Sequence, residues 1–341
     1  MKENQISTGR FIDGKEIFAV ELTNSLGSKV KIYNYGAIVS EFIVKNARGE
    51  QQDIVLGFDD IDGYLNKDYM DDDYPYLGVI VGRYSNRIKD GKYSIDGVDY
   101  EMAQSLHGGL TGFDKKVWDI LPTVDPSLTL QYISPDGEES FPGNLTVQLT
   151  FKLSDANELI LDYKAVTDAP TALNLTHHTY FNLNKNGENI ADHYLRIPAG
   201  NYLAQDKDYV VTGALVPVAG TSHDFLGGKT IGKDWDAEEG YDQSFVLDKP
   251  YGELGLASET TEVSSGLKLE VYTTEPVAHF YTAKYLNTAS GKGGRAYGPY
   301  SAFCIETQHY PNSVNVPEFP TTILRPGQTY AQTTIFKVSH T

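Results

Sequence analysis

Five short segments concentrate side chains that can transfer protons or bind hydroxyl groups. An imidazole can donate or accept a proton near neutral pH, and a carboxylate beside it can serve as the partner base. Amide and guanidinium groups can hold neighbouring hydroxyls. The segments are GRYSNRI (82–88), LHGG (106–109), NLTHHTYFNL (174–183), GYDQSFV (240–246) and FCIETQHYP (303–311). Packing alone would not require so many polar side chains in these segments, which makes them candidates for acid–base chemistry.

Glu306 is the first candidate for a reactive group. In an extended strand Cys304 and Glu306 share one face, while residues 303 and 305 share the other. In a central strand Glu306 would be drawn into a concave or buried region, where a carboxylate has to be paired or hydrogen-bonded. A structural ion pair or an exposed strand glutamate explains the same pattern, so strand geometry alone leaves the role open.

His177 and His178 are candidates for a group that donates or accepts a proton. Adjacent residues of an extended strand point to opposite faces, so only one of the two rings is expected to serve a given site. A purely structural histidine is the alternative for either one. If Glu306 lies near His178, its negative charge should favour the protonated imidazole and raise the pKa of His178.

Four further polar residues are candidates for holding hydroxyl groups, and each has an ordinary structural alternative. His107 precedes two glycines that allow a close backbone approach, or simply a turn. Asn86 and Arg87 could hydrogen-bond to adjacent hydroxyls of a ligand, but they could equally bind a neighbouring carboxylate of the protein. Asp242 could accept a hydrogen bond from a hydroxyl or could be a turn residue.

Metal and phosphate sites are not expected. His107, His178, His279 and Glu306 offer suitable ligand atoms, but no locally spaced histidine pair is present to anchor a metal. The glycine-rich stretch 291–295 lacks the spacing of a phosphate loop and is predicted to be a mobile surface loop. The acidic cluster 71–73 lacks EF-hand spacing and is predicted to be a solvated loop.

The composition excludes several classes of partner. The 341-residue chain has 46 acidic and 28 basic side chains and a formal net charge of -18, which disfavours nucleic acids and anionic membranes. Its single cysteine, Cys304, rules out an intrachain disulfide. No apolar run suits a signal peptide or a membrane span, so a soluble cytoplasmic protein is predicted. The 24 tyrosines supply many rings that are apolar on their faces and polar at the tip.

The elements that must position these residues are strands. Alternation of apolar and polar residues with period 2 runs through 18–22, 30–33, 128–132, 145–153, 159–163 and 267–272. Turn dipeptides stand between such runs, at 90–91, 96–97, 136–137, 186–187 and 265–266. No long apolar helical stripe is present, so any helices should be few, short and peripheral.

These patterns predict an all-β fold, most simply one large antiparallel β-sandwich. Residues 86–100 are expected to form successive short strands folded back at two Asp-Gly turns. Without a linker, low-complexity tract or internal repeat, residues 1–341 are expected to form a single domain.

Taken in order, the five segments resemble those of the aldose 1-epimerase (galactose mutarotase) family. The similarity extends from NYGA (34–37) and DIVLGF (53–58) through ETQHYP (306–311), and so covers nearly the whole chain. The resemblance implies a galactose mutarotase-like supersandwich with an open sugar cleft and no cofactor. It also implies a free monosaccharide as the partner, with a monomer or homodimer as the assembly.

The resemblance further implies roles for individual residues. Glu306 falls on the catalytic base of the family, and His178 on the acid. The residues expected to contact the sugar are His107 beside the ring oxygen, then Asn86, Arg87, Asp242 and His279. Two positions depart from the family pattern: Ser85 replaces a usual Ala, and His279 replaces a frequent Gln. The implied reaction is interconversion of the α and β anomers of hexoses such as galactose and glucose.

Two other functions fit parts of the pattern. A glycosidase would use Asp242 and Glu306 as paired carboxylates, and would release new reducing ends. A lectin-like module would bind sugar without accelerating mutarotation. A hexose-6-phosphate epimerase is disfavoured because no basic cluster lies near the five segments. The preferred aldose is left open by the sequence.

Overall fold

The computed structural model describes residues 4–70, 74–123, 126–184, 187, 189–236 and 238–341. The acidic cluster 71–73 and Asn186 of one predicted turn lie outside the described residues. Strands dominate the described chain, and its two α-helices are short: α1 (Ile61–Leu65) and α2 (Lys67–Met70). The predicted all-β fold with few short helices is confirmed.

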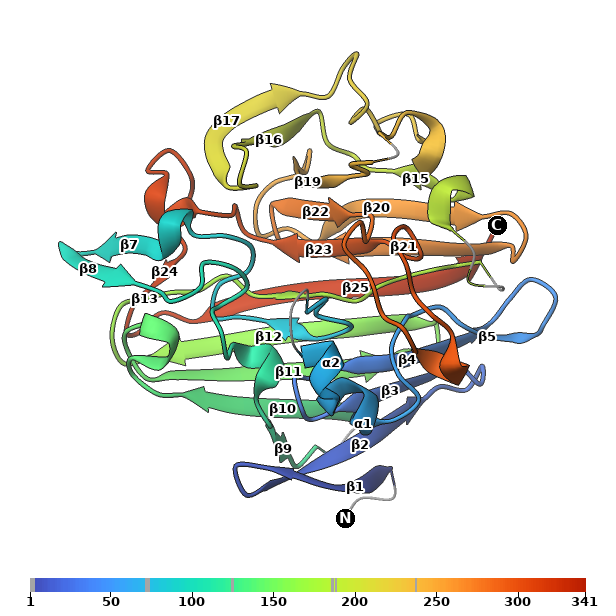
Figure 1. Cartoon of the computed structure of the whole chain (residues 1–341), viewed down its shortest axis with the longest axis horizontal. Helices are drawn as coiled ribbons and strands as arrows, with labels where there is room; N and C mark the ends of the chain where they lie inside the picture. The colour runs from blue at the N-terminus through green and yellow to red at the C-terminus, as the bar shows by residue number, and fades with distance from the viewer. Residues whose placement is uncertain (1–3, 71–73, 124–125, 185–186, 188, 237) are drawn as a thin grey trace.

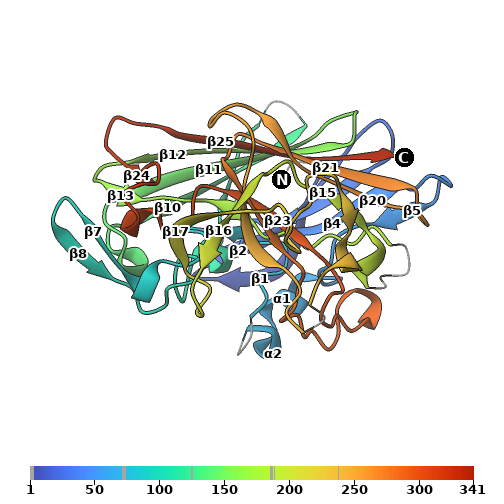
Figure 2. The same ribbon diagram turned by 90° about the horizontal axis from the view of Figure 1, so that it is seen from above.

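The largest sheet has nine strands, and its described neighbours pair antiparallel. In spatial order they are β18 (Lys229–Thr230), β15 (Tyr194–Arg196), β20 (Gly255–Glu262), β21 (Leu267–Thr273), β25 (Tyr330–His340), β12 (Glu158–Thr167), β11 (Leu145–Leu153), β10 (Ser127–Ser134) and β9 (Asp119–Leu121). Figure 2 shows its long strands as one layer, with the two helices on the opposite side of the molecule.

Two five-stranded sheets cover the inner face of this layer (Figure 1). One contains β1 (Gln5–Ile12), β2 (Lys15–Thr23), β3 (Lys29–Tyr33), β4 (Val39–Lys45) and β5 (Gln51–Asp53) in that order. The other, which carries the site, has the order β17 (Val211–Pro217), β16 (Asn201–Gln205), β19 (Asp242–Val246), β22 (Val277–Tyr281) and β23 (Cys304–Gln308).

Strict alternation explains how these layers pack. In β11 the residues Val147, Leu149 and Phe151 are buried, while the polar residues between them are partly exposed. The buried set joins one core cluster with residues of both five-stranded sheets, such as Ile32 and Phe280. Because side chains alternate between the faces of a strand, one face of the large sheet is apolar and the other polar.

The remaining strands of the described chain form three two-stranded sheets. They pair β6 (Ile80–Val81) with β14 (Thr176–His177), β7 (Lys92–Ile95) with β8 (Val98–Glu101), and β13 (Thr171–Ala172) with β24 (Ile323–Leu324). Seven 3-10 helices also occur in the described chain: Lys89–Gly91, Phe113–Lys115, Glu138–Ser140, Ile190–Asp192, Ile231–Lys233, Lys292–Gly294 and Ser313–Asn315.

The prediction for residues 86–100 is confirmed only in its second half. Asp96-Gly97 joins β7 and β8 as predicted. The strand expected before Asp90-Gly91 is wrong, because Asn86 has φ +59° and residues 89–91 form a 3-10 turn. A left-handed residue interrupts an extended strand, and here that bend places Asn86 against His107.

The stretch 291–295 lies largely at the surface, as predicted, but hydrogen bonds fix it to a distant segment. Lys292 Nζ donates hydrogen bonds to Asp53 Oδ2 and to the carbonyl of Val55, at 2.5 and 2.8 Å. The amide of Gly293 donates to Asp59 Oδ2 at 2.8 Å. The stretch is therefore anchored to the end of β5 and the loop that follows it, through contacts between segments far apart in sequence.

Candidate active site

One cavity of about 190 Å³ collects every residue that the sequence predicts for the site. These residues are Glu306, His178, His107, Asn86, Arg87, Asp242 and His279. The cavity lies below the range of roughly 300–1,000 Å³ that is usual for drug-sized ligands, so it suits a small molecule such as one sugar ring.

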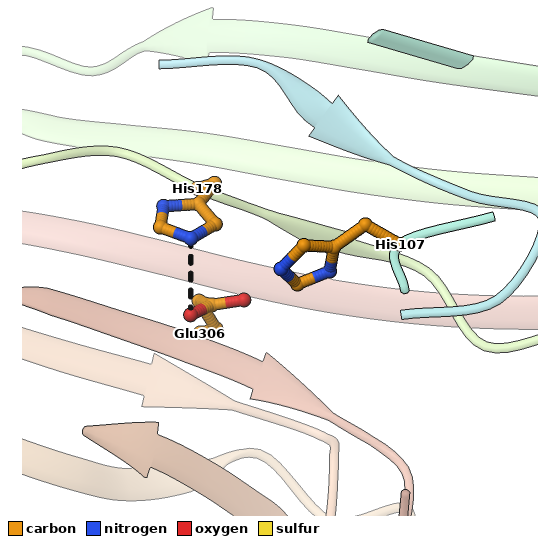
Figure 3. A group of neighbouring side chains, drawn as sticks. All are labelled: His107, His178 and Glu306. Carbon is orange, nitrogen blue, oxygen red and sulfur yellow. Dashed lines mark ion pairs between the residues drawn. The ribbon is translucent and has the colours of Figure 1, made fainter. Parts of the chain in front are cut away.

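The centre of the cavity is the pair of His178 and Glu306 (Figure 3). His178 follows β14, Glu306 lies in β23, and the distance from His178 Nε2 to Glu306 Oε1 is 3.5 Å. Both side chains are almost fully buried, at 5% and 2% exposure. The second oxygen, Glu306 Oε2, is buried and has no hydrogen-bond partner among the described residues. A carboxylate oxygen left free in this way is available to a ligand.

The environment of His178 corrects one expectation from the sequence. Burial is the largest influence on the pKa of His178 and lowers it, and the nearby Glu306 charge only partly offsets that effect. The Glu306 charge raises the pKa of His178, as predicted, but burial outweighs it, so the pKa ends below its ordinary value instead of above it. The reason is that removing an imidazolium from water costs more here than the carboxylate returns.

Cys304 contacts the other nitrogen of the same ring. Its Sγ lies 3.4 Å from His178 Nδ1, and burial keeps the pKa of the thiol well above its ordinary value. The protonated thiol can donate to Nδ1, which leaves the ring proton of the neutral histidine on Nε2. Nε2–H then faces Glu306.

His107 completes the group with a defined proton position. The backbone amide of Asn86 donates to His107 Nδ1 at 3.2 Å, so the neutral ring carries its proton on Nε2. Figure 3 shows the His107 ring directed toward His178 and Glu306. His107 therefore presents an N–H donor to the cavity, and burial lowers its pKa well below the ordinary value.

Gly108 explains why this histidine needs its glycine neighbour. A Cβ at residue 108 would lie 2.0 Å from the carbonyl oxygen of Gly82, and the backbone has φ +90°. Both the close approach and the left-handed turn that the sequence suggested are therefore present. They bring the His107 turn against the chain that leads into Asn86.

Asn86 and Arg87 lie at the edge of the cavity. Asn86 Oδ1 accepts a hydrogen bond from the Arg87 amide at 2.8 Å. The Arg87 guanidinium lies 5.5 Å from the centre of the Tyr209 ring. Across the part of the chain that the structure describes, no carboxylate forms an ion pair with Arg87, so its donors remain available to a ligand.

Asp242 begins β19 and is not a turn residue. His279 Nε2 lies 2.8 Å from Asp242 Oδ1, and His279 Nδ1 lies 2.9 Å from Ser244 Oγ. Burial alone would raise the pKa of Asp242, but the hydrogen bond and charge of His279 lower it overall. Asp242 is thus held as a charged hydrogen-bond acceptor at the cavity.

Comparison with known proteins decides the family. The model of the aldose 1-epimerase family matches residues 19–337. The chain is 41% identical to the galactose mutarotase of Rattus norvegicus and 32% identical to the aldose 1-epimerase of Escherichia coli strain K12. These alignments cover 91% of each chain for the rat protein, and 95% of this chain and 96% of the relative for the bacterial one. The chain belongs to the aldose 1-epimerase family.

Solved structures agree with this aldose 1-epimerase assignment. The aldose epimerase homologue from C. elegans superimposes with a TM-score of 0.86 at 30% identity, covering 94% of this chain and 98% of the other. Galactose 1-epimerase from Lactobacillus acidophilus superimposes with a TM-score of 0.84 at 26% identity, covering 99% of this chain and 98% of the other. The supersandwich implied by the sequence resemblance is confirmed.

Several tyrosines of this aldose 1-epimerase line the cavity without having been identified from the sequence. They are Tyr74, Tyr76, Tyr180, Tyr281 and Tyr285. The Tyr180 ring stacks on His178 with centroids 4.9 Å apart, which helps to exclude water from the pair. The high tyrosine content was the only signal in the sequence, and it did not say which rings face the cavity.

The neighbouring His177 points away from the aldose 1-epimerase cavity. Its Nδ1 lies 2.7 Å from Thr179 Oγ1 and its Nε2 lies 3.1 Å from the carbonyl oxygen of Ala37. Burial lowers the pKa of His177 to about 4. His177 is a buried, hydrogen-bonded residue of the core, while His178 faces the cavity.

A metal ion is a poor match for this group in the aldose 1-epimerase. Atoms of His107, His178 and Glu306 lie within 4.8 Å of one another. However, the Asn86 amide holds His107 in the form with Nε2–H toward the cavity, and a protonated nitrogen does not coordinate a metal.

Among the described residues, no helix is long and apolar enough to cross a membrane.

Proposed function

We propose that this aldose 1-epimerase interconverts the α and β anomers of free hexoses, such as galactose and glucose, through proton transfers by Glu306 and His178. The observation that carries the proposal is the buried pair, with one unpartnered Glu306 oxygen on a cavity of single-sugar size. The cavity residues come from segments between 74 and 306, so we treat residues 1–341 as one catalytic domain.

Ring opening moves two protons and breaks one bond. The Glu306 carboxylate takes the proton from the anomeric hydroxyl O1, and a carbonyl forms between C1 and O1. The C1–O5 bond breaks, its electron pair goes to O5, and His178 supplies a proton to O5. Rotation about C1–C2 followed by the reverse transfers closes the ring on the other face. Both residues end the cycle unchanged.

The surroundings of His178 support its role as the acid. Burial lowers its pKa, so the imidazolium gives up its proton more readily than an exposed histidine would. The active form pairs this imidazolium with the Glu306 carboxylate. Stacking by Tyr180 keeps the ring in place and shields it from solvent.

The remaining polar residues would orient the sugar and stabilise charge as it develops. His107 presents Nε2–H beside the pair and can donate to the ring oxygen as negative charge builds there. Asn86 and Arg87 offer donors at the edge of the cavity, and Asp242 offers an acceptor. Donors and acceptors fixed in a dry cavity favour one sugar orientation.

Polarimetry on freshly dissolved α-anomers tests the proposal. We expect Glu306→Gln to reduce the mutarotation rate by roughly 10² to 10⁴-fold, because the amide cannot accept the O1 proton. Glu270→Gln is the matched control, since Glu270 lies in β21 away from the cavity. Near-normal turnover by Glu306→Gln would overturn the assignment. A panel of glucose, galactose, xylose and arabinose would reveal the preferred aldose.

Reciprocal substitutions test the choice between the adjacent histidines. We expect His178→Gln to reduce kcat by roughly 10² to 10⁴-fold with little loss of stability. His177→Gln should mainly lower the denaturation midpoint, because it removes hydrogen bonds to Thr179 and Ala37. The opposite result, with His177 essential for turnover, would contradict the assigned roles.

A further inference from the structure

His279 occupies a central position in the sheet that carries the site. It lies in β22, directly opposite Ser244 of β19 and directly opposite Glu306 of β23. Its side chain is 4% exposed, yet it lines the cavity. A group in this position could act either on the sugar or on its protein neighbours.

The hydrogen bonds of His279 favour the protein neighbours. Nε2 bonds to Asp242 Oδ1 at 2.8 Å, and Nδ1 bonds to Ser244 Oγ at 2.9 Å. An imidazole has only two polar atoms, so neither ring nitrogen remains for a sugar hydroxyl. In contrast, no hydrogen bond from the described residues engages the second oxygen of Asp242, Oδ2.

We propose that His279 is a positioning residue that fixes Asp242, so that the free oxygen Oδ2 accepts a hydrogen bond from one sugar hydroxyl. This inference rests on the proposed function, and it deepens that function by naming how the acceptor is held. Ser244 fixes the ring plane of His279 from the opposite side. The sugar thus meets a charged acceptor of fixed orientation, and His279 acts on it only through Asp242.

The charges around His279 agree with this geometry. Burial alone would lower the pKa of His279, but the hydrogen bond and charge of Asp242, with a smaller effect of Glu306, raise it overall. Arg87 opposes this effect, and the rings of His178 and His107 also interact with His279 across the cavity. The ion pair therefore compensates two groups that would each be costly to bury alone.

A double-mutant cycle separates positioning from direct contact. We expect His279→Ala and Asp242→Ala each to raise KM about tenfold while kcat changes by less than about threefold, since a ground-state contact is lost. The KM of the double variant should be no higher than that of Asp242→Ala, because His279 affects the sugar only through Asp242. If the two effects multiply, to about a hundredfold in KM, then His279 contacts the sugar itself and the proposal is overturned.

Serine substitutions supply a matched comparison. Ser244→Ala removes the partner of Nδ1 and should raise KM about threefold. Ser258→Ala is the control, because Ser258 is equally buried in β20 but its hydroxyl has no partner among the described residues. Unchanged KM in Ser258→Ala together with raised KM in Ser244→Ala supports the proposal, whereas equal KM values for both would contradict it.

A measurement that does not need turnover keeps this inference separate from the proposed function. NMR titration of the His279 ring should show an imidazolium that persists above pH 6.5, and Asp242→Asn should move its titration to lower pH. Calorimetric binding of galactose should weaken in His279→Ala as KM rises. If the wild type binds galactose but does not mutarotate it, only the proposed function fails. A His279 titration unaffected by Asp242→Asn would overturn the positioning role alone.

Discussion

His279 lies directly opposite Glu306 in the antiparallel pair of β22 and β23, so that Glu306 is bordered by two histidines. The two rings differ in their second neighbours. His279 has Asp242 at 2.8 Å and its pKa is raised, whereas His178 has the neutral thiol of Cys304 at 3.4 Å and its pKa is lowered by burial. Of the two, only His178 has a ring nitrogen directed at Glu306, and in the proposed reaction it is the ring that releases a proton.

This difference predicts the pH dependence of the reaction. At pH 6.5, the ordinary pKa of histidine, less than half of His178 is in the acid form, because burial moves its pKa below that value. We therefore expect kcat/KM to keep rising as the pH falls from 8 through 6.5. Mutarotation rates measured by polarimetry across pH 4.5–8 would show this rise in kcat/KM. The assignment of His178 as the acid would be contradicted if kcat/KM were already maximal at pH 7.5 and decreased at lower pH.

Cys304 should matter because its sulfur holds the His178 ring in place. In the imidazolium, Nδ1–H donates to Sγ, so Cys304→Ala removes the acceptor, and the loss of about 1 kcal/mol should lower kcat about fivefold with KM unchanged. Cys304→Ser keeps an acceptor in the same place and should retain most of the rate. Polarimetric kcat values for the two variants provide the comparison. Equal rates for the alanine and serine variants would show that this contact does not orient the ring.

Gly108 should be essential for the position of His107. Gly108→Ala adds a Cβ only 2.0 Å from the Gly82 oxygen, so the turn has to move and His107 with it. We expect kcat/KM to fall at least tenfold. Gly97→Ala is a matched control, because Gly97 has a similar φ of +81° but open space around it. It should cost about 1 kcal/mol of stability without changing turnover. Equal turnover by both variants would argue against a role for the close approach.

Glu275 should make stability fall as the pH rises. Burial raises its pKa to about 8, and Oε2 has no hydrogen-bond partner among the described residues. Between roughly pH 4.5 and 8 the unfolded chain loses this proton while the folded chain keeps it, which costs up to about 1.4 kcal/mol per pH unit. The stability contribution is thus complete below pH 4.5 and lost as the pH approaches 8.

Glu275→Gln should remove that slope, because the amide does not titrate. In urea unfolding, the stability of the variant relative to wild type should improve steadily from pH 5 to pH 8. Parallel curves for Glu275→Gln and wild type would show that Glu275 titrates normally.

The sequence by itself determined the class of fold and indicated the residues of the candidate site. Alternation with period 2 is a local property, and it correctly marked β2, β3, β10, β11, β12 and β21. The ordered motifs identified Glu306, His178, His107, Asn86, Arg87, Asp242 and His279, all of which line one cavity. The sequence pattern also indicated that His177 and His178 face opposite sides.

Only the tertiary structure decided how these groups behave. The pKa of His178 depends on how much water the surrounding tyrosines exclude, and the partners of His279 depend on the register of β19, β22 and β23. The bend at Asn86 and the anchoring of Lys292 likewise rest on contacts with distant segments. Local periodicity carries no information on cross-strand register or desolvation, because both arise from residues far apart in the chain.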